Sequence, residues 1–136
     1  MEEQLIRITP NREKASSIFK MAETTAEMIS HIDKKKFPSN IIKEYYEVIR
    51  ELISIILLLD GYKAFGEGAH KRQIEYLEAN YKSFSKSEIA FLDELRTIRN
   101  KIAYDGFFVK EEYASRKLAG ILKIIDKLKS AASRKT

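Results

Sequence analysis

The sequence predicts an all-α fold, a five-helix antiparallel bundle without strands, and three observations support that class. Apolar residues recur three and four positions apart through most of the 136 residues, which is the spacing of a buried helical face. Residues that start or stop helices stand between these stretches. The connecting segments are short, which favours antiparallel neighbours.

The first two helices have clear boundary signals. Thr9-Pro10 is a cap and first-turn pair, and we expect the first helix to run from there into the basic cluster at residues 34–36. Pro38-Ser39 opens the second helix and Gly61 stops it. The second half of that helix is apolar nearly all round, which predicts burial on several sides, in a bundle core or a dimer seam.

Three further helices are expected after a loop at residues 61–68. The third runs over residues 69–80, and the fourth opens with a capping box of Ser85 and Glu88. The fourth is expected to unwind near Asp105-Gly106, and residues 107–109 form a short apolar link. The fifth covers residues 110–129, with an inward face of Leu118, Ile121, Leu122, Ile125 and Leu128.

Length and composition predict one domain over residues 1–136, with a core at about residues 10–130 and a basic, frayed tail at 130–136. The chain has no cysteine and two histidines, so neither disulfides nor a zinc site is expected, and we expect no cofactor. No apolar run is long enough for a signal peptide or a membrane span. These features favour a cytoplasmic protein.

The charge balance permits an anionic partner. The formal net charge is +5, and the sequence pI is about 9.3. This excess is spread over 45 charged residues, 25 basic and 20 acidic. It favours polyanions such as nucleic acid without requiring them.

One arginine of the fourth helix falls on an apolar arc. At about 100° per residue, Leu92, Leu95, Ile98 and Ile102 share one face, and Arg99 lies within it. A buried guanidinium needs an anion, a cluster of carbonyls or a partner surface for its donors. The alternative is that Arg99 packs its stem on the core and extends its charged end to the rim.

The same stretch resembles a known family. Arg99-Asn100 followed by Tyr104 is similar to the R-N-x-x-x-H signature of the HEPN family, with tyrosine in place of the histidine. The apolar run at residues 55–62, its glycine stop and His70 resemble the family's second helix and the start of its third. The resemblance covers roughly residues 10–130.

The resemblance implies an up-and-down four-helix core and a homodimer in which the arginine helices of both subunits line one cleft. Arg99 and Tyr104 are separated by about 140° around a regular helix, so we expect them not to share a face within one subunit. A twofold axis, or unwinding at Ala103, would bring them together. The expected cleft residues are Arg96, Arg99, Asn100 and Tyr104, with Lys101 and Asp105 at its edge.

Four functions remain open at this point. Family resemblance suggests a partner of a minimal nucleotidyltransferase, in which a tyrosine near the motif is modified, or a metal-independent ribonuclease toxin of a toxin-antitoxin pair. The cleft residues also suit RNA or nucleotide binding without cleavage, because arginine binds phosphate and tyrosine stacks on bases. A purely structural role, with Arg99 bonded to carbonyls, is the fourth. Tyrosine, with an ordinary pKa near 10, is a poor general base at pH 7, and we expect His70 to be an ordinary surface residue.

Overall fold

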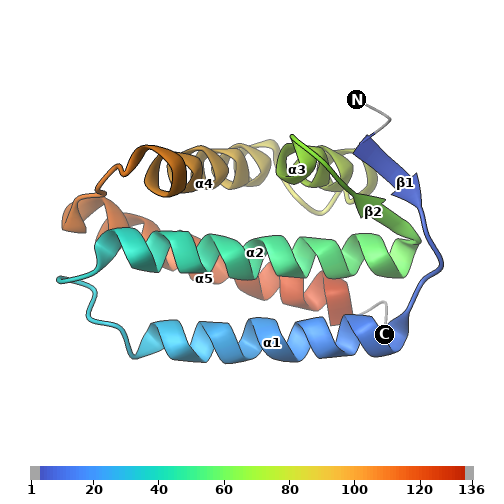
Figure 1. Ribbon diagram of the computed structural model, residues 1–136, viewed down its shortest axis with the longest axis horizontal. Helices are drawn as coiled ribbons and strands as arrows, with labels where there is room; N and C mark the ends of the chain where they lie inside the picture. Colours follow the sequence, from blue (N-terminus) through green and yellow to red (C-terminus); the bar gives the residue numbers. More distant parts are fainter. Residues whose placement is uncertain (1–3, 134–136) are drawn as a thin grey trace.

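The computed structural model describes residues 4–133, which form five helices and one short pair of strands (Figure 1). In chain order the elements are β1 (Leu5–Arg7), α1 (Arg12–Ser30), α2 (Pro38–Asp60), β2 (Tyr62–Ala64), α3 (Ala69–Asn80), α4 (Lys86–Asp105) and α5 (Glu111–Ser133). The predicted all-α class is confirmed in its broad form, since helices make up nearly all of the regular structure.

The expectation of no strand is wrong. β1 and β2 pair antiparallel, with Leu5 opposite Ala64 and Arg7 opposite Tyr62. Each strand has three residues, which is too short for an alternating pattern to be recognised. The pair fixes the N-terminal segment beside the end of α2, where the Ile8 N–H also donates to the Gly61 carbonyl at 2.9 Å.

Helix α2 is the centre of the molecule. It contacts each of the other four helices, and in Figure 1 it lies between α1 on one side and α3 and α4 on the other. Every residue from Leu52 to Leu58 except Ser54 is buried within the single chain. The apolar second half of α2 is therefore explained by burial inside the chain and does not require a dimer seam.

The boundaries of α2 are confirmed, whereas those of α1 differ from the expectation. Pro38 occupies the first turn of α2, and Gly61 follows it with φ of 89°, a left-handed conformation that favours glycine. Helix α1 begins after Asn11, whose side chain accepts from the Lys14 N–H, and it ends at Ser30. Residues 34–36 form a turn because Asp33 Oδ1 accepts from two of their backbone N–H groups.

The other three helices follow the prediction with two corrections. The Ser85 and Glu88 capping box is present, and α4 ends before Gly106. Residues 130–133, expected to be frayed, continue α5, and Ala131 and Ala132 are buried; residues 134–136 of the predicted tail lie outside the described residues. Leu122 is 43% exposed, because it lies on the outer side of α5, next to buried Ile121.

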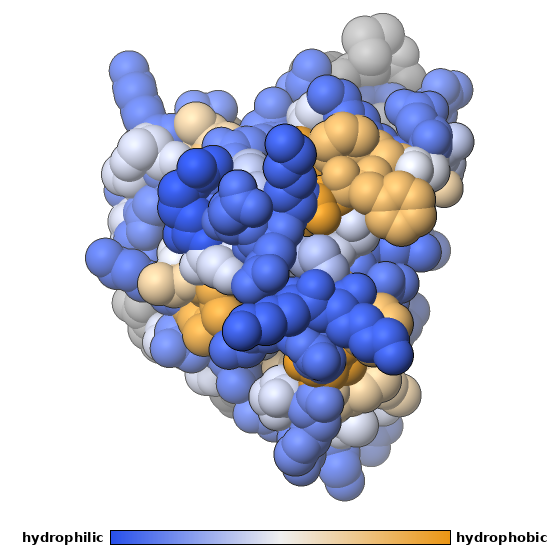
Figure 2. Space-filling model, turned by 90° about the vertical axis from the view of Figure 1, so that its left-hand side faces the viewer, coloured by the Kyte–Doolittle hydropathy of each residue, from blue (hydrophilic) through white to orange (hydrophobic). Residues whose placement is uncertain are grey.

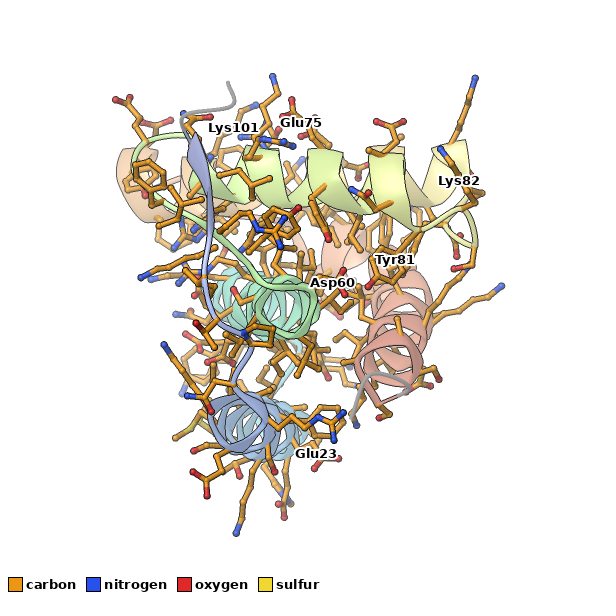
Figure 3. The ribbon with its side chains drawn as sticks, turned by 90° about the vertical axis from the view of Figure 1, so that its right-hand side faces the viewer. Glu23, Asp60, Glu75, Tyr81, Lys82 and Lys101 are labelled. Carbon is orange, nitrogen blue, oxygen red and sulfur yellow. The ribbon has the colours of Figure 1, made fainter. Side chains whose placement is uncertain are left out.

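Helix α3 runs across the end of α2 and is tied to it by a carboxylate. Figure 3 shows α1 and α2 nearly end-on, with α3 lying across the view. The hydroxyl groups of Tyr76 and Tyr81 each donate to Asp60 Oδ2 at 2.7 Å, and Asp60 and Tyr81 are labelled in the same figure. These bonds fix α3 at the end of α2, beside α4.

Membrane insertion was not expected from the sequence. Within the described part of the chain, no helix combines the length and apolar character needed to cross a bilayer.

Candidate functional site

The second half of α4 and the start of α3 enclose a hollow of about 450 Å³. Arg96, Asn100 and Tyr104 line it from α4, each four residues after the last, so they lie along one side of the helix as predicted. Residues 66–71 line the opposite wall. We call this hollow the α3–α4 groove. It brings together three of the four predicted site residues.

Arg99, the fourth predicted residue, does not line the groove. Its side chain is 12% exposed, and its Nη2 donates to Glu47 Oε2 on α2 at 2.9 Å. The sequence left open whether an anion, carbonyl groups or a partner surface binds this guanidinium. In the structure the partner is an anion, the Glu47 carboxylate of the same chain. Arg99 therefore needs no surface of a second subunit to satisfy its charge.

Arg99 also contacts the two motif residues that follow it. Its Nη1 lies 3.3 Å from Asn100 Oδ1 and 3.4 Å from the Tyr104 hydroxyl oxygen. Its guanidinium carbon lies 5.7 Å from the centre of the Tyr104 ring. Arg99 thus acts as a positioning residue that holds Asn100 and Tyr104 at the groove.

These contacts contradict the prediction that Arg99 and Tyr104 share no face within one subunit. Helix α4 stays helical through Asp105, so neither unwinding at Ala103 nor a twofold axis is needed. The wheel argument considered only the directions of the Cα–Cβ bonds. Long side chains on a helix lean back toward its N-terminus, so the tyrosine ring and the arginine guanidinium meet across five residues.

His70 is also misjudged as an ordinary surface residue. It lies in the first turn of α3, lines the groove, and its Nε2 is 2.7 Å from Arg50 Nη1. Arginine has no acceptor, so Nε2 must accept and the ring proton must be on Nδ1. Burial, together with the charges of Arg50 and Arg99, lowers the pKa of His70 to about 4, which makes the ring neutral at pH 7.

The groove offers two cationic side chains and the start of a helix, groups that can bind an anion. Arg96 and Lys71 contribute positive charge, and Glu67 is the acidic residue among its lining residues. Arg96 uses its Nε to bond Asp93 at 2.9 Å, and its guanidinium carries four more N–H donors. The cap residue of α3 is Gly68, which has no side chain to bond the N–H groups of the first turn. That helix end adds a partial positive charge beside the groove.

Exposed aromatic residues continue from the groove into the link between α4 and α5. Tyr104 is 73% exposed, Phe107 45% and Phe108 84%, and Lys101 Nζ lies 5.9 Å from the centre of the Phe107 ring. Figure 2 looks at this end of the molecule and shows a hydrophobic patch beside a strongly hydrophilic surface. The sequence predicts the link but not its exposure, because apolar residues are ordinarily expected to be buried.

Both ends of that link are anchored through the backbone, and at its first residue the Phe107 N–H donates to the Lys101 carbonyl at 3.1 Å. Val109 is 6% exposed, and its N–H donates to Ser39 Oγ at 2.7 Å, at the start of α2. These two bonds fix the backbone of the link and leave the side chains of the two phenylalanines on the surface.

The described residues offer no metal centre. Between residues 4 and 133, no group of three or more histidine, aspartate or glutamate side chains is placed to hold a metal ion. The groove itself is lined by arginine, lysine, amide, carboxylate, imidazole and phenol groups.

No family model, curated protein or solved structure matches this chain. The resemblance to HEPN proteins stays a prediction carried by a short motif. The observed features that bear on function are therefore the residues and geometry of the groove.

Proposed function

We propose that the protein binds single-stranded RNA in the α3–α4 groove and does not cleave it. The observation that carries this proposal is the convergence of Arg96, Asn100 and Tyr104 on one hollow that also contains Lys71 and the first turn of α3. Cations and helix N-termini bind phosphate oxygens, and an exposed tyrosine ring stacks on a base of any sequence.

The exposed aromatic residues favour a single strand over a duplex. Bases of a single strand are free to stack on protein rings, whereas those of a duplex already stack on one another. Tyr104 and Phe108 are 73% and 84% exposed and lie within one short segment. A strand held at Arg96 has these rings next to its bases.

The absence of cleavage follows from the groups that surround the groove. Transfer of the 2′-hydroxyl proton needs a base with an available lone pair. His70 is neutral at pH 7, but its Nε2 accepts from Arg50 and its Nδ1 carries the proton. Tyr104 takes the place of the signature histidine. This argues against the alternative of a metal-independent ribonuclease.

The ribonuclease alternative has its own test. Tyr104→His restores the complete HEPN signature and places a side chain with an ordinary pKa near 6.5 in the groove. We expect this variant to gain chelator-resistant cleavage of labelled RNA, and Arg99→Ala in the same background to remove it. Robust cleavage by the wild-type protein would overturn the proposal of a non-catalytic function.

We also propose a HEPN-like four-helix core of α1, α2, α4 and α5, supported by the packing of α2 against the other three. The homodimer remains part of this proposal, but a different surface now supports it. Since α2 is buried within the chain and Arg99 pairs with Glu47, the exposed Phe107 and Phe108 are the surface that favours a second copy. Light scattering that gives the monomer mass of 15.8 kDa at micromolar concentration would contradict it.

The same exposed rings favour a second candidate function, in which the partner is another protein such as a minimal nucleotidyltransferase. Aromatic residues often anchor protein interfaces. Phe107→Ser would weaken such an interface and leave Arg96, Tyr104 and Phe108 in place for RNA. RNA binding and protein association are therefore separable by variants.

RNA binding is tested with a labelled single-stranded RNA and fluorescence anisotropy. We expect Arg96→Ala combined with Lys71→Ala to weaken binding at least tenfold, because two cationic phosphate contacts are lost. The matched control is Lys20→Ala with Lys123→Ala, which removes the same charge from exposed positions outside the groove. Equal affinity of the two double variants would contradict the proposal.

A further inference from the structure

A second cavity lies beneath the strand pair. Most of the residues that line it do not line the α3–α4 groove. It measures about 320 Å³ and is enclosed by α1, α2, the β2 segment and the start of α3. Figure 3 looks at the end of the molecule that the strand pair covers. Preformed small-molecule sites are concave and of similar volume. Gly66, Ala69 and His70 line both hollows, so they form the wall between them.

The inner wall of this cavity is apolar. Side chains from three elements contribute to it, namely Ile8, Ile18, Leu57, Leu58, Ala64 and Phe65. A ligand with an apolar body would remove this surface from water.

Two polar side chains interrupt the apolar wall at a defined place. Gln73, only 7% exposed, donates from its Nε2 to Ser54 Oγ at 2.8 Å. Since Ser54 accepts this bond, its own hydroxyl proton is available to donate into the cavity. The Oε1 of Gln73 is buried and has no hydrogen-bond partner among the described residues. The Ser54 hydroxyl can therefore donate to a ligand oxygen, whereas Gln73 Oε1 can only accept.

The charged side chains that line the cavity are all cations, and one of them, Arg50, also pairs with Glu47 at 3.6 Å. Lys14, Arg50 and Lys63 line it, and none of its lining residues is acidic. His70 adds a neutral ring whose Nδ1–H is a further donor, because its Nε2 is occupied by Arg50. The cavity therefore combines an apolar interior with cations and donors, and none of its lining side chains carries a negative charge.

We infer that this cavity binds a small amphipathic carboxylate, with its anionic head at Arg50 and Lys14 and its alkyl or aryl body between α2 and the β2 segment. A phosphate ester with a large polar body would leave the apolar wall unused. An apolar molecule without charge would leave the cations and the Ser54 donor unused. This inference is independent of RNA binding in the α3–α4 groove.

The test uses straight-chain carboxylates as probes, measured by isothermal titration calorimetry with the full chain. Hexanoate, octanoate and decanoate are compared with octanol and octyltrimethylammonium. We expect affinity to rise about fourfold for each added methylene until the cavity is full. Octanol and the cation should bind at least tenfold more weakly than octanoate. Equal binding of octanoate, octanol and octyltrimethylammonium would overturn the inference.

Variants locate the probe. Ala64→Trp fills the cavity from the strand side and should abolish octanoate binding, and Lys14→Gln should weaken it several-fold. Lys20→Gln, one turn and a half further along α1 and outside the cavity lining, is the control and should bind like the wild type. Thermal unfolding verifies that each variant is folded. Unchanged octanoate affinity in folded Ala64→Trp would contradict the proposed location, and RNA binding by the same variant is expected to be unchanged.

Discussion

The two halves of α4 differ in what their side chains do, although they belong to one continuous helix. Ile89, Leu92 and Leu95 in the first half are at most 8% exposed. After Leu95, no residue of α4 up to Asp105 is buried. The first half packs on the core, and the second carries Arg96, Asn100 and Tyr104 to the α3–α4 groove.

This contrast separates folding from binding along one element. Substitutions in the first half should change the free energy of unfolding, because buried apolar area is lost there. Substitutions at the groove should change RNA affinity and leave stability nearly unchanged. Arg99 stands between the two, since its stem is buried and its charged end bonds both Glu47 and the groove residues.

The largest stability effect is expected in the first half. Leu92 is 0% exposed, and Leu92→Ala should lower the free energy of unfolding by about 2 to 5 kcal/mol, because it removes buried area and leaves a cavity. Urea unfolding measures this loss. A loss below about 1 kcal/mol would show that the first half of α4 is not part of a well-packed core.

Breaking the Arg99 ion pair should have an intermediate effect. Glu47→Ala leaves a guanidinium that is 12% exposed without its carboxylate partner, and we expect a loss of about 1 to 3 kcal/mol. The control is Glu23→Ala, since Glu23 is half-exposed and pairs with Lys129 at 3.5 Å. This control should cost less than about 1 kcal/mol. Equal losses in the two variants would show that Arg99 is not an internal anchor.

The pH dependence of stability tests the environment of His70. An unfolded chain has an ordinary histidine pKa near 6.5, whereas burial lowers the pKa of His70 to about 4. Between these values the unfolded state binds a proton that the folded state does not, so stability decreases as the pH falls through that window. We expect a loss of about 1 kcal/mol from pH 7 to pH 5, reduced because the ring is partly exposed.

The variant His70→Gln removes this contribution while the carboxylates titrate as before. The difference in unfolding free energy between wild type and variant should therefore shrink as the pH falls from 7 to 5. Urea unfolding at each pH gives that difference. A constant difference would mean that His70 has an ordinary pKa in the folded protein.

The smallest stability effect is expected at the exposed end of the helix. Tyr104 is 73% exposed, so Tyr104→Ala should change the free energy of unfolding by no more than about 0.5 kcal/mol. The same variant should weaken single-stranded RNA binding about fivefold or more, because a stacking surface is lost. Tyr113→Ala is unsuitable as a control because its hydroxyl donates to Glu94. The control is Leu122→Ala, which removes an apolar side chain that is 43% exposed and lies outside the groove. A large loss of stability in Tyr104→Ala would overturn the separation of folding from binding.

The elements that the sequence predicts well are those with long periodic patterns and side-chain signals at their ends. Gly61 after α2 and Ser85 before α4 stand where a helix must stop or start, and both boundaries are confirmed. The strand pair was missed because each strand has three residues and its stability comes from pairing across 55 to 59 positions of the chain. Local patterns carry no information on such pairing.

The site was predicted in part for the same reason. Arg96, Asn100 and Tyr104 repeat every four residues, so their common side follows from helix geometry. The partners that define the site come from elsewhere, since Glu47 is 52 residues from Arg99 and Arg50 is 20 residues from His70. A periodic pattern within one helix does not predict these contacts between helices.

We propose that RNA binds where α3 begins and α4 ends. An NMR titration tests this binding site most directly. The amide signals of the ¹⁵N-labelled 15.8 kDa chain are followed while a single-stranded RNA oligonucleotide is added. We expect the signals that shift to be those of residues 66–71 and of residues 96–108. Shifts confined to α1 or α5, or no shifts at RNA concentrations that saturate binding, would contradict the account.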